Sequence, residues 1–164
     1  MVRLLSIVAA SAFLLDQGSK YVVLHILNLP DHIVIDVASP FLRFVMAWNR
    51  GVNFGLMASD ADLTRWALVV ISLVISAVIF VWAKRRSDHW FAIGAGLVIG
   101  GAVGNAIDRI IYGAVADFLN MSCCGIVNPF SFNVADIAIF GGAALLILRS
   151  GDPKPETTEQ TRGS

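Results

Sequence analysis

Charged residues are scarce in this sequence. Only 15% of its 164 residues are Asp, Glu, Lys or Arg, while 57% are hydrophobic; a soluble globular domain has about 25% charged residues. A water-soluble chain of this length has too little interior to bury so much apolar surface. The low charge therefore excludes an ordinary soluble domain and predicts that lipid is the solvent for much of the chain.

The sequence also lacks a net charge and a cysteine framework. Its 12 basic and 12 acidic residues cancel, so we expect no nucleic-acid partner. The only two cysteines, Cys123 and Cys124, are adjacent. Adjacent cysteines bridge poorly and lack the spacing of metal ligands. We therefore interpret them as apolar residues of an interfacial loop.

Four apolar segments stand out against the roughly 20 residues that a membrane-spanning helix requires. The second of them is free of charge and is followed at once by three basic residues. We predict a membrane all-α fold of four transmembrane helices with a small β element. The predicted spans are residues 4–27, 65–83, 90–112 and 130–148.

The first segment also has a competing interpretation as a cleaved signal peptide. Arg3 would be its charged region, and Ala10-Ser11-Ala12 resembles a cleavage site. The apolar pattern resumes after Lys20, however, which a mature N-terminus does not need. We therefore favour a retained helix.

The distribution of basic residues orients the predicted spans. With four spans, Arg3, the cluster Lys84-Arg85-Arg86 and Arg149 fall on one side, whereas the loop 113–131 contains neither Lys nor Arg. By the positive-inside rule, both termini are cytoplasmic and the first and third loops face outward.

The regions outside the spans differ in character. The loop 28–63 contains the runs HIVIDV and FLRFVMAW, whose β-branched and aromatic residues predict short strands in an extracytoplasmic sheet. Residues 151–164 are polar, with two prolines, and predict a disordered cytoplasmic tail. We expect residues 1–150 to form a single domain.

Ionisable residues inside the predicted spans require an explanation, because a charge at mid-bilayer costs about 2.5–3.5 kcal/mol on insertion scales. Asp16 and Lys20 are four residues apart, with the acid first, which favours an ion pair on one helical face. Asn105, Asp108 and Arg109 lie near the outer end of the third span. Arg109 needs a permanent counter-charge, and we expect Asp108 to supply it.

Two acids remain without an obvious base. Asp117 follows the third span, and Asp136 lies near the start of the fourth, with Asn133 three residues before it. In the predicted topology both acids lie at the outer boundary of the membrane. Two neighbouring carboxyls share a proton, which provides a general base and a general acid for peptide hydrolysis. For either acid alone, a helix cap or a solvated loop residue is an equally good interpretation.

Several motifs occur in a fixed order along the chain. They are DQGSK from Asp16, NRGVNFG from Asn49, GGAVGNAIDR from Gly100, VADF from Val115 and FNVADIAI from Phe132. Together these motifs resemble the lipoprotein signal peptidase (signal peptidase II) family of aspartic membrane peptidases. The match extends from the first span to the fourth.

The resemblance implies a function. Members of this family are hydrolases that remove signal peptides from diacylglyceryl-modified prolipoproteins, cleaving just before the lipidated cysteine, without a metal or other cofactor. It implies that Asp117 and Asp136 are the catalytic pair and that the remaining motif residues support the pair or contact substrate. These residues, which support the pair or contact substrate, are Asn105, Arg109, Asn133, Asp16, Lys20 and Asn49.

The resemblance also implies a location and a departure from the pattern. We expect a monomer in the bacterial inner membrane, in contact with membrane lipid, with its active site at the extracytoplasmic face. Asn53 stands where the family usually has a small residue, which we expect to alter local contacts only.

Two other functions are compatible with parts of the sequence. A small proton-coupled transporter would also use intramembrane acids, but such acids lie near the midplane. A membrane scaffold would use the glycine-rich segment GAGLVIGGAVG for close helix packing, but it leaves the two acids unexplained.

Overall fold

The computed structural model describes residues 1–51, 61–122 and 128–150. Most of them are helical, and three short strands form one small sheet. The helices are α1 (Val2–Tyr21), which continues as a π-helical turn (Val22–Ile26), α2 (Leu29–His32), α3 (Ala61–Ala83), α4 (His89–Tyr112) and α5 (Val134–Ser150). The strands are β1 (Val34–Ala38), β2 (Leu42–Asn49) and β3 (Val115–Met121).

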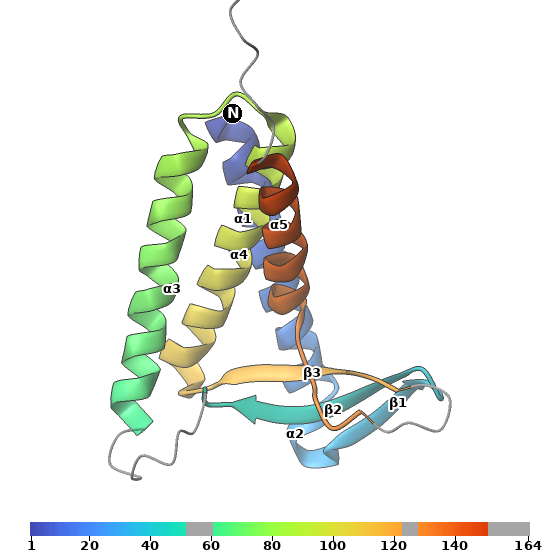
Figure 1. Cartoon of the computed structure of the whole chain (residues 1–164). Coiled ribbons are helices and arrows are strands. Elements are labelled where there is room, and N and C mark those ends of the chain that lie inside the picture. Colours follow the sequence, from blue (N-terminus) through green and yellow to red (C-terminus); the bar gives the residue numbers. More distant parts are fainter. Residues whose placement is uncertain (52–60, 123–127, 151–164) are drawn as a thin grey trace, which may run out of the picture.

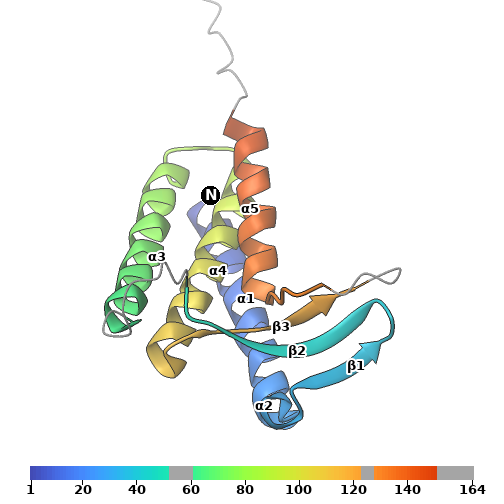
Figure 2. The ribbon, with the colours of Figure 1, turned by 60° about the horizontal axis from the view of Figure 1, so that its bottom comes forward.

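The four long helices run side by side, and the sheet lies across one end of them (Figures 1 and 2). Helix α4 is the central one and packs against α1, α3 and α5. The N-terminus, the α3–α4 connection and the last turn of α5 all lie at the end opposite the sheet (Figure 1). The helical bundle therefore has two distinct ends. We call the one that carries the sheet the sheet end, and the one that carries the N-terminus and the last turn of α5 the terminal end.

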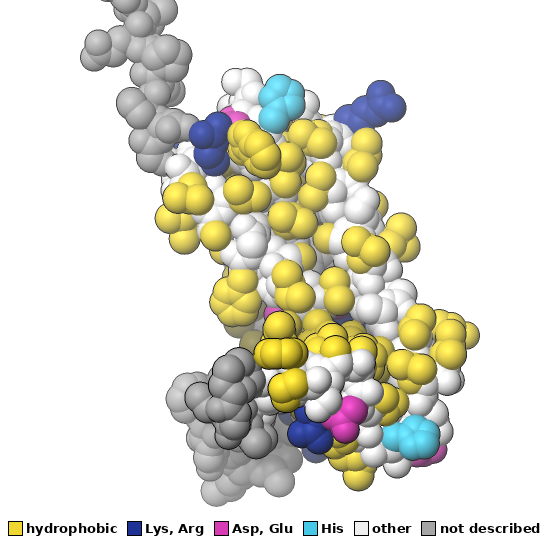
Figure 3. All heavy atoms as spheres, turned by 90° about the vertical axis from the view of Figure 1, so that its right-hand side faces the viewer, with side chains coloured by type: hydrophobic (Ala, Val, Ile, Leu, Met, Phe, Trp, Pro, Cys, Tyr) yellow, Lys and Arg dark blue, Asp and Glu magenta, His cyan; other side chains and the backbone are white. Residues whose placement is uncertain are grey.

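Among the described residues, three helical stretches are long and apolar enough to cross a membrane. They are Val2–Ile26, Asp62–Ala83 and His89–Tyr112. Helix α3 exposes a continuous set of large apolar side chains, such as Val74 and Val78. On the face shown in Figure 3, hydrophobic side chains cover the middle of the molecule, and most charged ones lie towards its two ends. Such a surface is suited to lipid rather than water.

The predicted fourth span, 130–148, differs from the observed helix. Helix α5 has 17 residues and begins at Val134, so the prediction of helix at 130–133 was wrong. Phe132 is instead paired with Leu119 in a β-bridge, which holds this segment extended until Asn133. At 1.5 Å per residue, α5 is about 25 Å long.

Close approach between α4 and α5 depends on glycine. A Cβ atom at Gly101 would lie 2.5 Å from the carbonyl oxygen of Ala135, and one at Gly142 would lie 2.6 Å from that of Gly94. Either contact is too short for a real side chain. The small residues of α4 therefore allow the backbones to meet, as in other membrane helix pairs.

The sheet is antiparallel, in the order β1-β2-β3. The sequence predicted the first two strands but not β3. Gly113, at φ 77°, ends α4 in a left-handed conformation, as is common at helix C-termini, and β3 begins two residues later. Phe118 of β3 then packs edge-to-face on Phe44 of β2, with 5.5 Å between ring centroids. This short turn fixes β3 against the end of the bundle.

Several sequence-based predictions lie outside the described residues. They concern Asn53, Cys123, Cys124 and the tail 151–164.

Candidate active site

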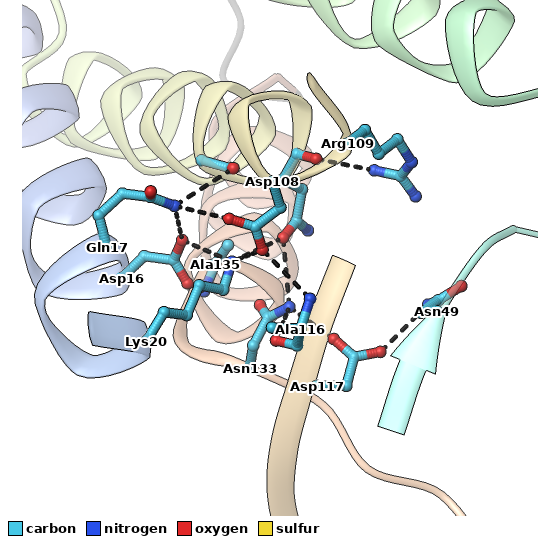
Figure 4. A network of polar contacts seen from close by, with 12 residues as sticks. Asp16, Gln17, Lys20, Asn49, Asp108, Arg109, Ala116, Asp117, Asn133 and Ala135 are labelled. Carbon is cyan, nitrogen blue, oxygen red and sulfur yellow. Dashed lines mark hydrogen bonds and ion pairs between the residues drawn. The ribbon is translucent and has the colours of Figure 1, made fainter. Parts of the chain in front are cut away.

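A buried ion cluster joins α1 to α4. The Lys20 Nζ atom lies 2.7 Å from Asp16 Oδ2 and 2.7 Å from Asp108 Oδ2 (Figure 4). The Lys20 residue is 2% exposed and both aspartates are 0% exposed. A buried lysine requires such partners, because an unpaired charge away from water is strongly disfavoured.

Neutral donors add hydrogen bonds to both carboxylates of this cluster. The backbone N–H of Ala135 donates to Asp16 Oδ1 at 2.9 Å, and that of Ala116 donates to Asp108 Oδ2 at 3.2 Å. The Gln17 side chain donates to both acids, at 3.1 Å to Asp16 and 2.9 Å to Asp108. The cluster therefore ties α1 and α4 to the start of α5 and to β3.

Asp108 and Arg109 do not form a salt bridge among the described residues. Asp108 pairs with Lys20 instead, and Arg109 points away from the cluster (Figure 4). Consecutive residues of an α-helix project about 100° apart, so these two side chains face different neighbours. The Arg109 Nη1 atom donates to the backbone oxygen of Asn105 at 3.1 Å, and its buried Nε has no hydrogen-bond partner within the described part of the chain.

Asp117 lies on β3, not on a helix. Its Oδ1 accepts a hydrogen bond from Asn133 Nδ2 at 2.6 Å, and its Oδ2 accepts one from Asn49 Nδ2 at 3.1 Å. The residue is 4% exposed. Strand β3 thus holds this acid between β2 and the N-terminus of α5 (Figure 4).

Asp136 is held by the local structure of the α5 N-terminus. The Asn133 side chain accepts a hydrogen bond from the Asp136 N–H at 2.9 Å, and Asp136 Oδ2 accepts one from the Asn133 N–H at 3.1 Å. This reciprocal arrangement is a capping box. The second oxygen, Oδ1, accepts a hydrogen bond from Asn105 Nδ2 at 3.0 Å. Asp136 therefore caps its helix and also belongs to the polar network.

Asn133 forms hydrogen bonds with both acids, Asp117 and Asp136. This residue donates to Asp117 through its side-chain amide and to Asp136 through its backbone N–H. All the predicted site residues contribute to this region: Asp16, Lys20, Asn49, Asn105, Asp108, Arg109, Asp117, Asn133 and Asp136. Gln17 also belongs to it, although the sequence analysis did not single it out. The sequence indicated Gln17 only through its place in the motif DQGSK. Its hydrogen bond to Asp108 joins residues far apart in sequence, so it could not be predicted from local spacing.

The electrostatics of the pair favour retention of a proton. Burial and, second to it, the negative charge of Asp136 raise the pKa of Asp117 from 3.8 to about 6. Hydrogen bonds from Asn49 and Asn133 oppose this shift. A buried carboxyl that keeps its proton closer to neutral pH, beside a second acid, can act as the general acid of a peptide hydrolysis.

Comparisons with known proteins also match this chain to a family of signal peptidases. The family described as Signal peptidase (SPase) II matches residues 8–151. A lipoprotein signal peptidase of Methylobacterium sp. (strain 4-46) is 39% identical over 87% of this chain and 85% of its own length. A lipoprotein signal peptidase of Methylorubrum extorquens (strain PA1) is 46% identical over 71% of this chain and 68% of its own length. A bacterial membrane enzyme solved by the in meso method at 1.9 Å resolution shares the fold, with a TM-score of 0.74 at 23% identity over 90% of this chain and 92% of that one.

Proposed function

This chain belongs to the signal peptidase II family, and we propose on that premise that Asp117 and Asp136 are its catalytic pair. The protein is an integral membrane protease that removes signal peptides from prolipoproteins. The observation that carries the assignment of the pair is the hydrogen bonding of both carboxyls to Asn133. Burial of Asp117 beside a second acid supports it.

The chemistry follows from one proton shared by two carboxyls. The ionised carboxylate takes a proton from water, and the resulting hydroxide adds to the scissile carbonyl carbon. The carboxylic acid hydrogen-bonds to the carbonyl oxygen. As the tetrahedral intermediate collapses, the C–N bond breaks and the leaving nitrogen takes the acid's proton. The carboxylate that accepted the water proton becomes the new acid, so the pair regains its starting charge.

The place of the acids suits a lipid-modified substrate. Asp117 lies just beyond α4 and Asp136 in the first turn of α5, where the helical bundle meets the sheet (Figure 1). We propose that this junction lies at the extracytoplasmic boundary of the inner membrane. The acyl chains of a diacylglyceryl-cysteine would then remain in the leaflet, where each buried CH₂ contributes about 0.8 kcal/mol. The bond just before that cysteine would lie at the depth of the acids.

The topology belongs to the same proposal. Helices α1, α3, α4 and α5 form four spans of a single domain, residues 1–150, that acts as a monomer with both termini in the cytoplasm. The basic residues Lys84, Arg85 and Arg86 follow α3, and Arg149 lies in the last turn of α5. All these basic residues lie at the end of the bundle opposite the sheet (Figure 1). By the positive-inside rule, they support a cytoplasmic location for that end. The short α5 requires local adaptation of the bilayer.

A reconstituted cleavage assay tests the proposal. The purified protein is incubated with a diacylglyceryl-modified prolipoprotein, with the same prolipoprotein lacking the lipid as the matched substrate control. Cleavage before the lipidated cysteine in the first substrate only is the expected result, and the Asp117→Asn variant should cleave neither. Equal cleavage of both substrates would contradict the lipid requirement, and an active Asp117→Asn variant would contradict the assignment of the pair.

A further inference from the structure

Lys20 makes one contact that the ion cluster does not require. Besides its two ion pairs, its Nζ donates to Asn105 Oδ1 at 3.2 Å. The two acids of the cluster, Asp16 and Asp108, already accept hydrogen bonds from Gln17 and from backbone N–H groups. The third N–H of the ammonium is thus directed out of the cluster, towards the catalytic pair.

This contact determines which way the Asn105 amide faces. An ammonium group has only donors, so the Asn105 atom beside Lys20 must be the carbonyl oxygen. The NH₂ group then faces Asp136, whose Oδ1 accepts its hydrogen bond at 3.0 Å. In the flipped orientation, two donors would face each other at Lys20 and two acceptors at Asp136.

The same oxygen of Asn105 also orients Asn133. It accepts a hydrogen bond from Asn133 Nδ2 at 3.2 Å, and that NH₂ group donates to Asp117 Oδ1 at 2.6 Å. Asn105 is 8% exposed and Asn133 is 0% exposed, so water does not readily replace either partner. One amide orientation therefore aligns a donor with each of the two acids.

We propose that Lys20 is a positioning residue for the catalytic pair and acts through Asn105. Its ammonium fixes the orientation of the Asn105 amide, which directs hydrogen-bond donors at Asp136 and, through Asn133, at Asp117. This role is additional to the ion pairs that Lys20 makes between α1 and α4, and it rests on the proposed catalytic roles of Asp117 and Asp136. Lys20 itself does not touch the substrate.

Two substitutions of Lys20 separate the positioning role from the charge. Met and Gln are both neutral and similar in length, but only Gln retains an N–H that reaches towards Asn105. Each is combined with Asp16→Asn, which keeps the net charge of the cluster and its acceptor for Ala135. We expect Lys20→Met to lower kcat by about 10–100-fold, the effect of one lost charge-assisted hydrogen bond. Lys20→Gln should recover most of that loss, and KM should change less than about threefold in both.

A double-mutant cycle tests whether Lys20 acts through Asn105. Asn105→Leu alone should lower kcat. In that background, exchanging Lys20→Gln for Lys20→Met should change kcat by less than about twofold, because coupled residues are non-additive. Asp36→Asn is the matched control: it removes a charge from a surface ion pair with Arg43, away from Asn105 and the ion cluster, so it should leave kcat unchanged.

The outcomes are distinct. Equal kcat for the Met and Gln variants at equal melting temperature would overturn the positioning role, as would an additive double-mutant cycle. If the combined variants do not fold, the single Lys20→Met and Lys20→Gln variants are compared in the same way, and a kcat for Asn105→Leu within about twofold of wild type also overturns the proposal. A wild-type protein that fails to cleave the lipidated prolipoprotein, or an Asp117→Asn variant that cleaves it, would instead contradict the proposed function.

Discussion

The Asn133 side-chain amide donates to Asp117 Oδ1 at 2.6 Å, which joins the N-terminus of α5 to the middle of β3. Asn133 also caps α5 and hydrogen-bonds Asp136 through its backbone. One residue thus carries two functions, a helix cap and the alignment of the acid pair. Substitutions that retain one function and remove the other should have separable effects.

Asn133→Ala should remove both functions, whereas Asn133→Ser should retain the cap. Loss of an N-cap costs about 1 kcal/mol, so we expect a lower melting temperature for the Ala variant and a smaller change for Ser. The Ser hydroxyl is too short to reach Asp117, so cleavage of the lipidated substrate should fall at least about tenfold in both. Thermal unfolding in detergent and initial rates measure the two effects. A Ser variant with wild-type activity would show that the side-chain contact to Asp117 is dispensable.

A glycine beside the ion cluster provides a second prediction. A Cβ atom at Gly104 would lie 2.6 Å from Asp16 Oδ2, whereas one at Gly141 would meet no atom of the described residues within 4 Å. Overpacking of this kind costs about 1–3 kcal/mol, so Gly104→Ala should lower the melting temperature. Gly141→Ala is the matched control in α5 and should be neutral or stabilising, since Ala is a better helix former by up to about 1 kcal/mol. Equal melting temperatures for the two variants would contradict the close contact between α4 and Asp16.

The raised pKa of Asp117 predicts a pH-dependent contribution to stability. Burial and the Asp136 charge raise this pKa from 3.8 to about 6. The folded protein therefore holds a proton that the unfolded chain has already lost between about pH 4 and pH 6. This contribution is fully present below pH 4 and is lost as the pH rises through about 6. The wild type should lose melting temperature relative to Asp117→Asn across that range, and parallel curves would contradict the shift.

Thiol labelling tests the orientation of the chain. In a background in which Cys123 and Cys124 are replaced by Ser, one variant carries Phe41→Cys beside the sheet and another carries Ser87→Cys between α3 and α4. Both positions are exposed. The proposed topology places Phe41 outside and Ser87 in the cytoplasm. A membrane-impermeant maleimide should label the first in intact spheroplasts and the second only after lysis; the reverse pattern would invert the topology.

The sequence predicts the parts of this fold that depend on local pattern. The apolar lengths predict α1, α3 and α4, and the β-branched runs predict β1 and β2. The spacing of Asp16 and Lys20 also predicts their ion pair, because residues four apart share a helical face. Each of these features is encoded within a few turns of one segment.

The remaining features depend on contacts between distant segments. Successive residues of strand β3 are buried, from Val115 to Phe118, so the strand lacks the alternating pattern of a half-exposed strand. Lys20 and Asp108 are far apart in sequence. The sequence analysis therefore assigned Asp108 to Arg109, its neighbour along the chain. Only the approach of α1 to α4, which small residues such as Gly104 allow, brings Lys20 to Asp108.

The central claim is that Asp117 and Asp136 perform the cleavage together, and single-turnover rates of their Asn variants test it most directly. Each substitution retains the size of the side chain and removes its ability to exchange a proton. Asp36→Asn in β1 is the matched control, because that acid is largely exposed and, within the described part of the chain, its ion pair is with Arg43 at the surface. We expect both Asp117→Asn and Asp136→Asn to reduce the rate on a diacylglyceryl-modified prolipoprotein by at least about 10³-fold while remaining folded. The control should match the wild type, and a folded Asp117→Asn or Asp136→Asn variant that cleaves within about tenfold of the wild-type rate would contradict the account.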